Sequence, residues 1–118
     1  MKVHEIADQL GLAVKAGSPG LDREVTGGYA SDLLSDVIAN ARDGDIWITL
    51  QIHQNIVAVA SLTRIAAIIL VGSREPAEDT TASADAEGIP ILSTEMTTFE
   101  TVAHLHDIGI KGGRRVGL

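Results

Sequence analysis

The spacing of apolar residues along the chain predicts helices that alternate with short strands. An apolar stripe at i, i+3, i+4 and i+7 starts at Val3, and Gly11 follows it as a helix stop. Helices are also predicted at residues 33–41, 55–63, 76–88 and 97–109, and strands at residues 12–17, 21–28, 46–50, 66–72 and 89–94. Because strands and helices alternate after residue 44, the predicted fold class is α/β, a three-layer α/β/α sandwich with a mostly parallel sheet.

Residue types at the element boundaries add local predictions. The sequence SPG at residues 18–20 favours a type II turn, and the strands on either side of it are expected to pair as an antiparallel hairpin. Ser31 is expected to be the N-cap of the helix that follows it. The apolar face of the last helix is formed by Phe99, Val102, Ala103 and His106.

Composition limits the size and chemistry of the core. With 118 residues, the chain is expected to form one domain over residues 1–118. Hydrophobic residues make up 45% of the chain but aromatic residues only 3%, so Ala, Val, Ile and Leu have to fill the core. Trp47, Tyr29 and Phe99, one of each aromatic type, are therefore conspicuous.

The charge balance argues against several classes of partner. A formal net charge of −7 disfavours binding to nucleic acid or to an anionic membrane surface. The basic sequence KGGRR at residues 111–115 is the exception, and we interpret it as a terminal tail. The chain shows neither a signal-peptide pattern nor an apolar run of membrane-spanning length, so a soluble, cytoplasmic protein is expected.

Cysteine and histidine usage argues against a metal or redox centre. The chain has no cysteine, which excludes disulfides, thiol nucleophiles and thiolate ligation of zinc or iron–sulfur clusters. His104 and His106 are two residues apart on a predicted helix, so their rings diverge. We expect neither a metal ion nor a cofactor.

Two stretches are candidates for a binding site. The sequence REVTGGYASDLLSDV at residues 23–37 passes from a strand through paired glycines into a helix, but it lacks the phosphate-binding glycine patterns, and Asp32 and Asp36 would repel a phosphate. A tight turn or a close approach to the backbone is favoured there over a phosphate site. The second stretch, with Thr49, Gln51 and His53, lies at the end of a core strand, where open α/β sheets bind ligands. For this second stretch, a ligand-binding site and a polar loop without a binding role remain equal alternatives.

Catalysis has weaker support. Asp32 could pair with Ser31 or with His53 as an acid–base pair, but no catalytic motif of recognised spacing accompanies them.

The long stretch at residues 22–76, followed by AEGIPILST at residues 86–94, resembles a DRTGG domain. The letters of that name occur as Asp22-Arg23 and Thr26-Gly27-Gly28, and GYASDLLSDV followed by GDIWITLQ carries most of the likeness. The resemblance implies a fold similar to the N-terminal domain of HPr kinase/phosphorylase. It also implies a regulatory role, because in such proteins the chemistry resides in another domain and no catalytic residue is carried over. With its GYASDLL sequence at residues 28–34, the chain resembles stand-alone DRTGG domains that are encoded beside iron-hydrogenase and other redox-complex subunits of anaerobes.

Three functions follow as hypotheses. The leading one is a non-catalytic regulatory or assembly module that forms a homodimer or binds a protein partner through Tyr29, Ser31 and Asp32, and senses a small ligand. The alternative is a nucleotide-binding sensor. The least favoured is a small hydrolase that uses Asp32 and His53. The residues expected at a ligand site or interface are Arg23, Thr26, Gly27, Gly28, Tyr29, Ser31, Asp32, Thr49, Gln51 and His53.

Overall fold

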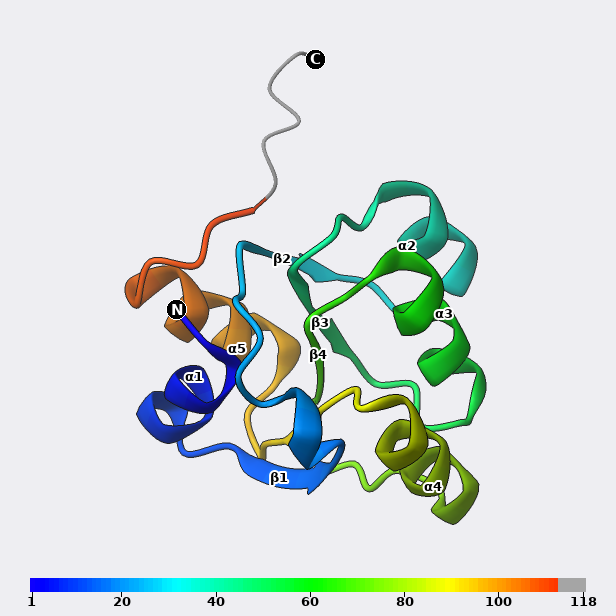
Figure 1. Cartoon of the computed structure of the whole chain (residues 1–118). Helices are drawn as coiled ribbons and strands as arrows, with labels where there is room; N and C mark the ends of the chain where they lie inside the picture. The colour runs from blue at the N-terminus through cyan, green and yellow to red at the C-terminus, as the bar shows by residue number, and fades with distance from the viewer. Residues whose placement is uncertain (113–118) are drawn as a thin grey trace.

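A computed structural model describes residues 1–112, in which five helices cover the two faces of one five-stranded sheet (Figure 1). The predicted α/β class is confirmed. The elements are α1 (Val3–Leu10), β1 (Ala13–Ala16), the 3-10 helix η1 (Ser18–Gly20), β2 (Gly27–Ala30), α2 (Leu34–Asn40), β3 (Asp45–Thr49), α3 (Asn55–Thr63), β4 (Ala67–Leu70), α4 (Glu78–Glu87), β5 (Ile91–Ser93) and α5 (Thr98–Asp107). Of the basic segment 111–115, residues 113–115 lie outside the described part.

The strand order in the sheet is β1-β5-β4-β3-β2. Strands β2 to β5 are parallel, and β1 pairs antiparallel with β5 at the opposite edge from β2. The predicted hairpin between the first two strands is therefore wrong. The segment before β2 pairs with the start of α1 instead, because the Val3 N–H donates to the Arg23 carbonyl and the Val25 N–H donates to the Met1 carbonyl.

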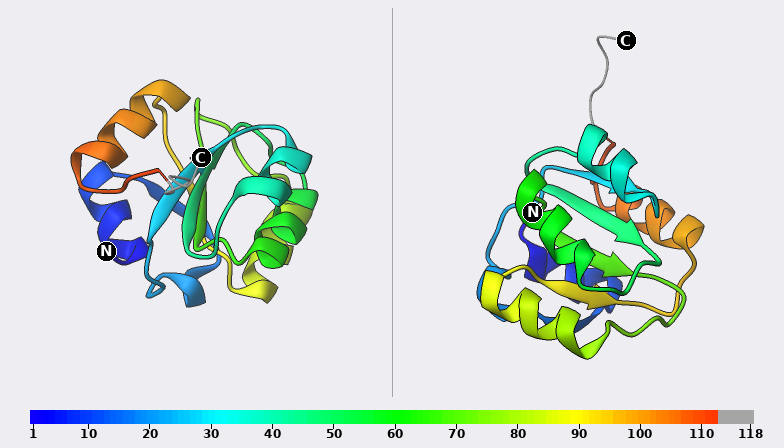
Figure 2. Two further views of the ribbon diagram at one scale, coloured as in Figure 1. Left: turned by 90° about the horizontal axis from the view of Figure 1, so that it is seen from above. Right: turned by 90° about the vertical axis from the view of Figure 1, so that its right-hand side faces the viewer.

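Each face of the sheet has its own apolar core. On one face, α1 and α5 cover Ile46, Ile48 and Leu92, and on the other, α2, α3 and α4 cover Trp47 and Ile68. Figure 2 shows the two helical layers on opposite sides of the sheet. Strand β3 is buried along its whole length, so its polar ends are held in fixed positions.

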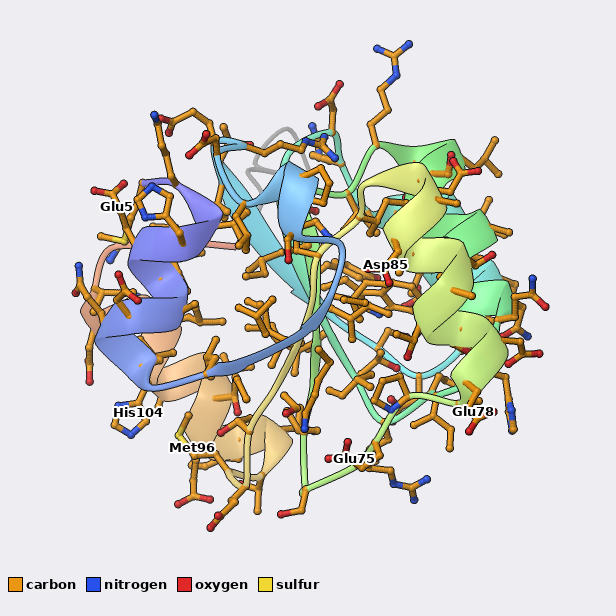
Figure 3. All side chains as sticks on the ribbon, turned by 60° about the horizontal axis from the view of Figure 1, so that its bottom comes forward. Glu5, Glu75, Glu78, Asp85, Met96 and His104 are labelled. Atoms are coloured by element: carbon orange, nitrogen blue, oxygen red, sulfur yellow. The ribbon has the colours of Figure 1, made fainter. Side chains whose placement is uncertain are left out.

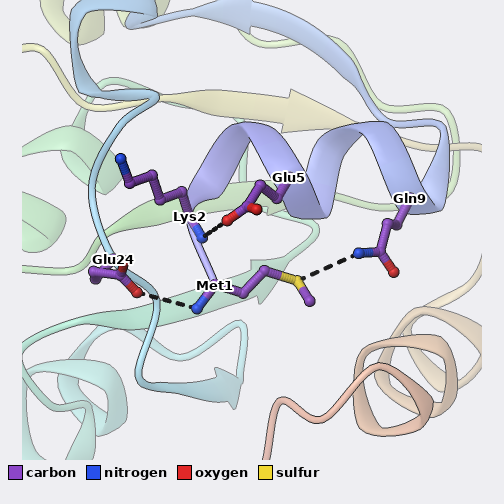
Figure 4. Close-up of polar contacts among 5 residues, drawn as sticks. All are labelled: Met1, Lys2, Glu5, Gln9 and Glu24. Atoms are coloured by element: carbon purple, nitrogen blue, oxygen red, sulfur yellow. Dashed lines mark hydrogen bonds and ion pairs between the residues drawn. The ribbon is translucent and has the colours of Figure 1, made fainter.

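Polar contacts surround the start of α1, and one of them joins it to the segment before β2 (Figure 4). The terminal ammonium of Met1 lies 3.0 Å from the Glu24 carboxylate. The Lys2 backbone N–H donates to the Glu5 carboxylate at 2.7 Å, and this hydrogen bond lowers the pKa of Glu5. The apolar stripe predicted from Val3 is confirmed, since Val3 and Ile6 are fully buried.

Three boundary predictions need correction. Gly20 does not have the positive φ that a type II turn requires, and SPG forms the 3-10 turn η1. Ser31 is not the N-cap of α2, because its backbone N–H is still bonded to Ile48 of the sheet and Leu33 occupies the cap. The face of α5 that carries Phe99 is exposed, and Thr101 and Leu105 are buried in its place.

Candidate functional site

The first part of the DRTGG-like motif lies at the amino end of the parallel strands. The Arg23 guanidinium donates to the carbonyls of Ile65, at 2.9 Å, and Arg64, at 3.2 Å, where α3 ends and the chain turns toward β4. The Arg64 carbonyl also accepts from the Gly44 backbone N–H at 3.0 Å, so Arg23 joins the segment before β2 to the connection between α3 and β4. Thr26 contacts the turn before β3, where its hydroxyl donates to the Asp43 carbonyl at 3.3 Å. Both side chains brace the fold.

The paired glycines lie inside strand β2, so the expected tight turn is wrong, and the alternative expectation, a close approach to the backbone, applies to Gly27. A Cβ on Gly27 would lie 2.7 Å from Oδ1 of Asp45, a carboxylate only 2% exposed whose Oδ2 accepts from the Arg42 backbone N–H at 2.8 Å. A Cβ on Gly28 would make ordinary contacts at 3.6 Å with Ile46 and Ile110. The absence of a side chain at Gly27 thus leaves room for a buried carboxylate. At Gly28, by contrast, the space would also accommodate a Cβ.

Tyr29 connects the edge strand β2 to helix α2. Its hydroxyl donates to Oδ2 of Asp36 at 2.8 Å, and Asn40 donates to Oδ1 at 2.9 Å. The hydrogen bond from Tyr29, with others from Ser31 and Asn40, lowers the pKa of Asp36. Tyr29 is therefore half-buried and bonded to a helix of its own chain.

The two candidate stretches meet at the carboxyl end of β2 and β3. Asp32 Oδ1 accepts from the Thr49 hydroxyl at 2.8 Å and from the Leu50 backbone N–H at 2.7 Å, and the Gln51 side chain donates to the Asp32 carbonyl at 2.9 Å. We call these four residues the Asp32 corner. Parallel strands end at the same edge of a sheet, which explains why two sequence-distant stretches converge.

The Asp32 corner is tied together by its own hydrogen bonds. His53 lies on the exposed loop that follows, and the hydrogen bonds and ion pairs of residues 1–112 do not join it to Asp32. Ser31 uses its hydroxyl to accept from the Leu33 backbone N–H at 3.2 Å. Arg23 and Thr26 are at the far end of the strands, so the ten predicted residues divide between two ends of the sheet.

Sequence reasoning missed the exposed surface of α5. Phe99 is 86% exposed and Val102 is 42% exposed, and with Ala103 they form what we call the α5 stripe. A hollow of ≈320 Å³ lies along this stripe beside His106 and Asp107. A smaller hollow of ≈120 Å³ continues from Val102 toward edge strand β2. The signal that could have revealed the exposure is the neighbouring pair Thr101 and Leu105, four residues apart on another face of the helix.

Comparison with known proteins identifies the family. The DRTGG domain family matches residues 5–108, so the chain belongs to this family. One similar solved structure contains the CBS and DRTGG domains of the regulatory region of Clostridium perfringens pyrophosphatase, complexed with its activator diadenosine tetraphosphate. The two chains are 17% identical with a TM-score of 0.69, over 86% of this chain and 44% of that one. This likeness shows a shared fold. A search of curated proteins gave no match.

The part of the chain that the structure describes offers neither a metal-binding cluster nor a membrane-spanning helix. Over residues 1–112 there is no group of three or more His, Asp or Glu side chains that could hold a metal ion. No helix in the same range combines the length and the apolar character needed to cross a bilayer.

Proposed function

We propose that residues 1–118 form a single, non-catalytic regulatory domain that acts in the cytoplasm by pairing with a second copy of itself. The observation that carries the proposal is the α5 stripe, where Phe99 projects from the helix with 86% of its surface exposed. Aromatic side chains that project from a surface are favoured anchors of protein interfaces. This interface replaces the one expected at Tyr29, whose hydroxyl is bonded to Asp36 of its own chain.

The α5 stripe has features that suit pairing about a two-fold axis. Ala103 is small and lies between Phe99 and Asp107, so it lets two helices approach closely. In an antiparallel pair, each Phe99 faces the hollow of ≈320 Å³ on the other copy, and an isologous interface requires this kind of self-complementarity.

Charge along α5 favours the same orientation. Glu100 lies in the first turn, and Lys111 follows the last turn with its Nζ 3.3 Å from Nε2 of His106. Antiparallel pairing brings Glu100 of one helix toward Lys111 of the other, and this contact is attractive despite the neighbouring Asp107 and the net charge of −7 on each chain.

The test is sedimentation equilibrium over a range of protein concentrations. The wild-type chain is expected to reach the mass of a dimer, and Phe99→Ser is expected to remain a monomer. Leu62→Ser is the matched control, because Leu62 is also an exposed apolar residue, 69% exposed, but lies on α3. A wild-type chain that stays monomeric at the highest concentration contradicts the proposal, as does equal dimer formation by Phe99→Ser.

A nucleotide-sensing role is the second candidate. It is supported by the Clostridium perfringens regulatory region, whose structure contains an activator with two nucleoside groups. Of the residues first expected to form such a site, Asp32 lies against Thr49 and Gln51, whereas Arg23 lies at the opposite end of the strands. A thermal-shift screen against nucleotides tests this role, and a selective increase of the unfolding midpoint would support it.

The regulated process is a further part of the proposal. The resemblance to copies encoded beside redox-complex subunits of anaerobes points to a hydrogenase complex as the target. Because the chain has no cysteine, it would act on such a complex as a partner and not by ligating a cluster through thiolates. Co-purification of the tagged chain with hydrogenase subunits from its own cells would support the link.

A further inference from the structure

A polar hollow of ≈500 Å³ lies at the carboxyl end of β4 and β5, beside the start of β1. This end of a parallel sheet is where open α/β folds bind ligands. Figure 3 shows Glu75, on the rim of the hollow, at the same end of the molecule as Met96. The side chains that line it with polar groups are Lys15, Ser73, Glu75, Ser93, Thr94 and Glu95.

Ser93 is the residue that points to a ligand. It is only 8% exposed, and its hydroxyl has no hydrogen-bond partner among residues 1–112. The other buried polar side chains are all bonded, for example the Thr80 hydroxyl to the Ile52 carbonyl and the Thr101 hydroxyl to the Thr97 carbonyl. No buried polar side-chain atom in the described range is both sealed from solvent and unpartnered, so the Ser93 hydroxyl opens into the hollow.

Because the Ser93 hydroxyl opens into the hollow without a protein partner in the described chain, it is available to donate to a molecule bound there. The neighbouring hydroxyl of Thr94 accepts from the Met96 backbone N–H at 3.2 Å, which leaves its proton available for donation. Ser73, with φ +61°, holds a third hydroxyl at the turn after β4. Three hydroxyl groups that can donate therefore surround the hollow.

The charges around the hollow determine the class of ligand. Lys15 Nζ lies 3.2 Å from the Glu75 carboxylate, and Glu95 adds a second carboxylate. Two acids against one base disfavour phosphate and other anions. The same set suits an uncharged molecule with adjacent hydroxyl groups, because carboxylates accept from such hydroxyls while the ammonium and the serine hydroxyls donate to them.

We propose that this hollow binds an uncharged, hydroxyl-rich molecule, either a free pentose or the ribose of a nucleoside, with Ser93 donating from the floor and Glu75 and Glu95 accepting at the walls. The proposal rests on the ligand-sensing part of the proposed function and is independent of the α5 stripe. Its failure would show in ligand titrations and leave the sedimentation result unchanged, so the two failures are distinguishable.

The experiment is an amide ¹H–¹⁵N NMR titration of the full chain with D-ribose, adenosine, adenosine monophosphate and inorganic phosphate. Saturable shifts at Ser73, Ser93 and Thr94 with D-ribose or adenosine are expected, and the monophosphate should bind more weakly than adenosine. Shifts with D-ribose but not adenosine would identify a free pentose as the ligand, and shifts with adenosine alone a nucleoside. Ser93→Ala is expected to weaken binding roughly 5- to 10-fold, the effect of one lost hydrogen bond.

Stability measurements on the same variants check the premise. Ser93→Ala should unfold at the same denaturant concentration as the wild type or a higher one, because its hydroxyl has no protein partner. Thr101→Val is the matched control and should unfold earlier, since it loses the bond to Thr97. The proposal would be overturned if neither D-ribose nor adenosine gave saturable shifts, or if Ser93→Ala bound with unchanged affinity. Tighter binding of phosphate than of adenosine would also overturn it.

Discussion

The paired glycines of β2 allow a test of whether Gly27 is required for packing against the buried Asp45 carboxylate. Gly27→Ala places a Cβ 2.7 Å from Oδ1 of Asp45, closer than real Cβ contacts come, so the carboxylate has to move. Asp45 is 2% exposed, and its other oxygen holds the Arg42 backbone N–H at 2.8 Å, so a shift disturbs a buried hydrogen bond. Gly28→Ala, one residue along the same strand, meets neighbours only at 3.6 Å.

The two substitutions are expected to change the free energy of unfolding by different amounts. Overpacking at Gly27 should cost about 1–3 kcal/mol of unfolding free energy, while Gly28→Ala should change it by less than ~1 kcal/mol and can raise it, because alanine restricts the unfolded chain. Neither glycine has a positive φ, so backbone strain does not enter the comparison. Urea denaturation of the two variants and the wild type measures the difference, and a midpoint shift at constant slope reports stability alone. A Gly27→Ala chain as stable as the wild type would refute the packing argument.

Three further predictions follow from single contacts. Asp32→Ala should lower the free energy of unfolding by about 1–3 kcal/mol because the buried Thr49 hydroxyl loses its acceptor. Asp32→Asn should lower it by less because its amide oxygen still accepts. Urea curves that coincide for the two variants would contradict this. Thr97→Ala should cost about 1 kcal/mol, since its side chain caps α5 by accepting from the Glu100 backbone N–H; unchanged helicity and midpoint on heating would count against the cap. The pKa values of Asp36 and Glu100 are lowered in the folded chain, so both carboxylates bind fewer protons there than in the unfolded chain. The free energy of unfolding should therefore be constant near neutrality and decline as the pH falls below about 5. Denaturation midpoints that stay constant down to pH 3 would refute this prediction.

Much of the element order could be predicted because it depends on local periodicity. The helix at residues 55–63 begins and ends where the apolar run and Asn55 place it. The pairing of β1 could not be predicted in the same way, since its partner β5 lies far along the chain. The face of α5 was mispredicted because Thr101 is polar, yet the Thr97 carbonyl accepts its hydroxyl hydrogen bond at 2.8 Å and so permits its burial.

The candidate site was predictable only in part. That Asp32 would lie near residues 49–51 follows from the rule that parallel strands end at one edge, and the Asp32 corner agrees with it. The position of Arg23 depends on carbonyls 41 and 42 residues away in sequence, at Arg64 and Ile65. Such tertiary partners leave no local pattern, which is why residues that brace the fold were grouped with residues at the opposite end.

Self-association through the α5 stripe can be observed directly in a series of amide ¹H–¹⁵N NMR spectra recorded at rising protein concentration. Concentration-dependent shifts are expected at Phe99, Val102 and Ala103, with Leu62 on α3 unaffected. Spectra that do not change with concentration, or shifts centred on α3 while α5 stays constant, would contradict it.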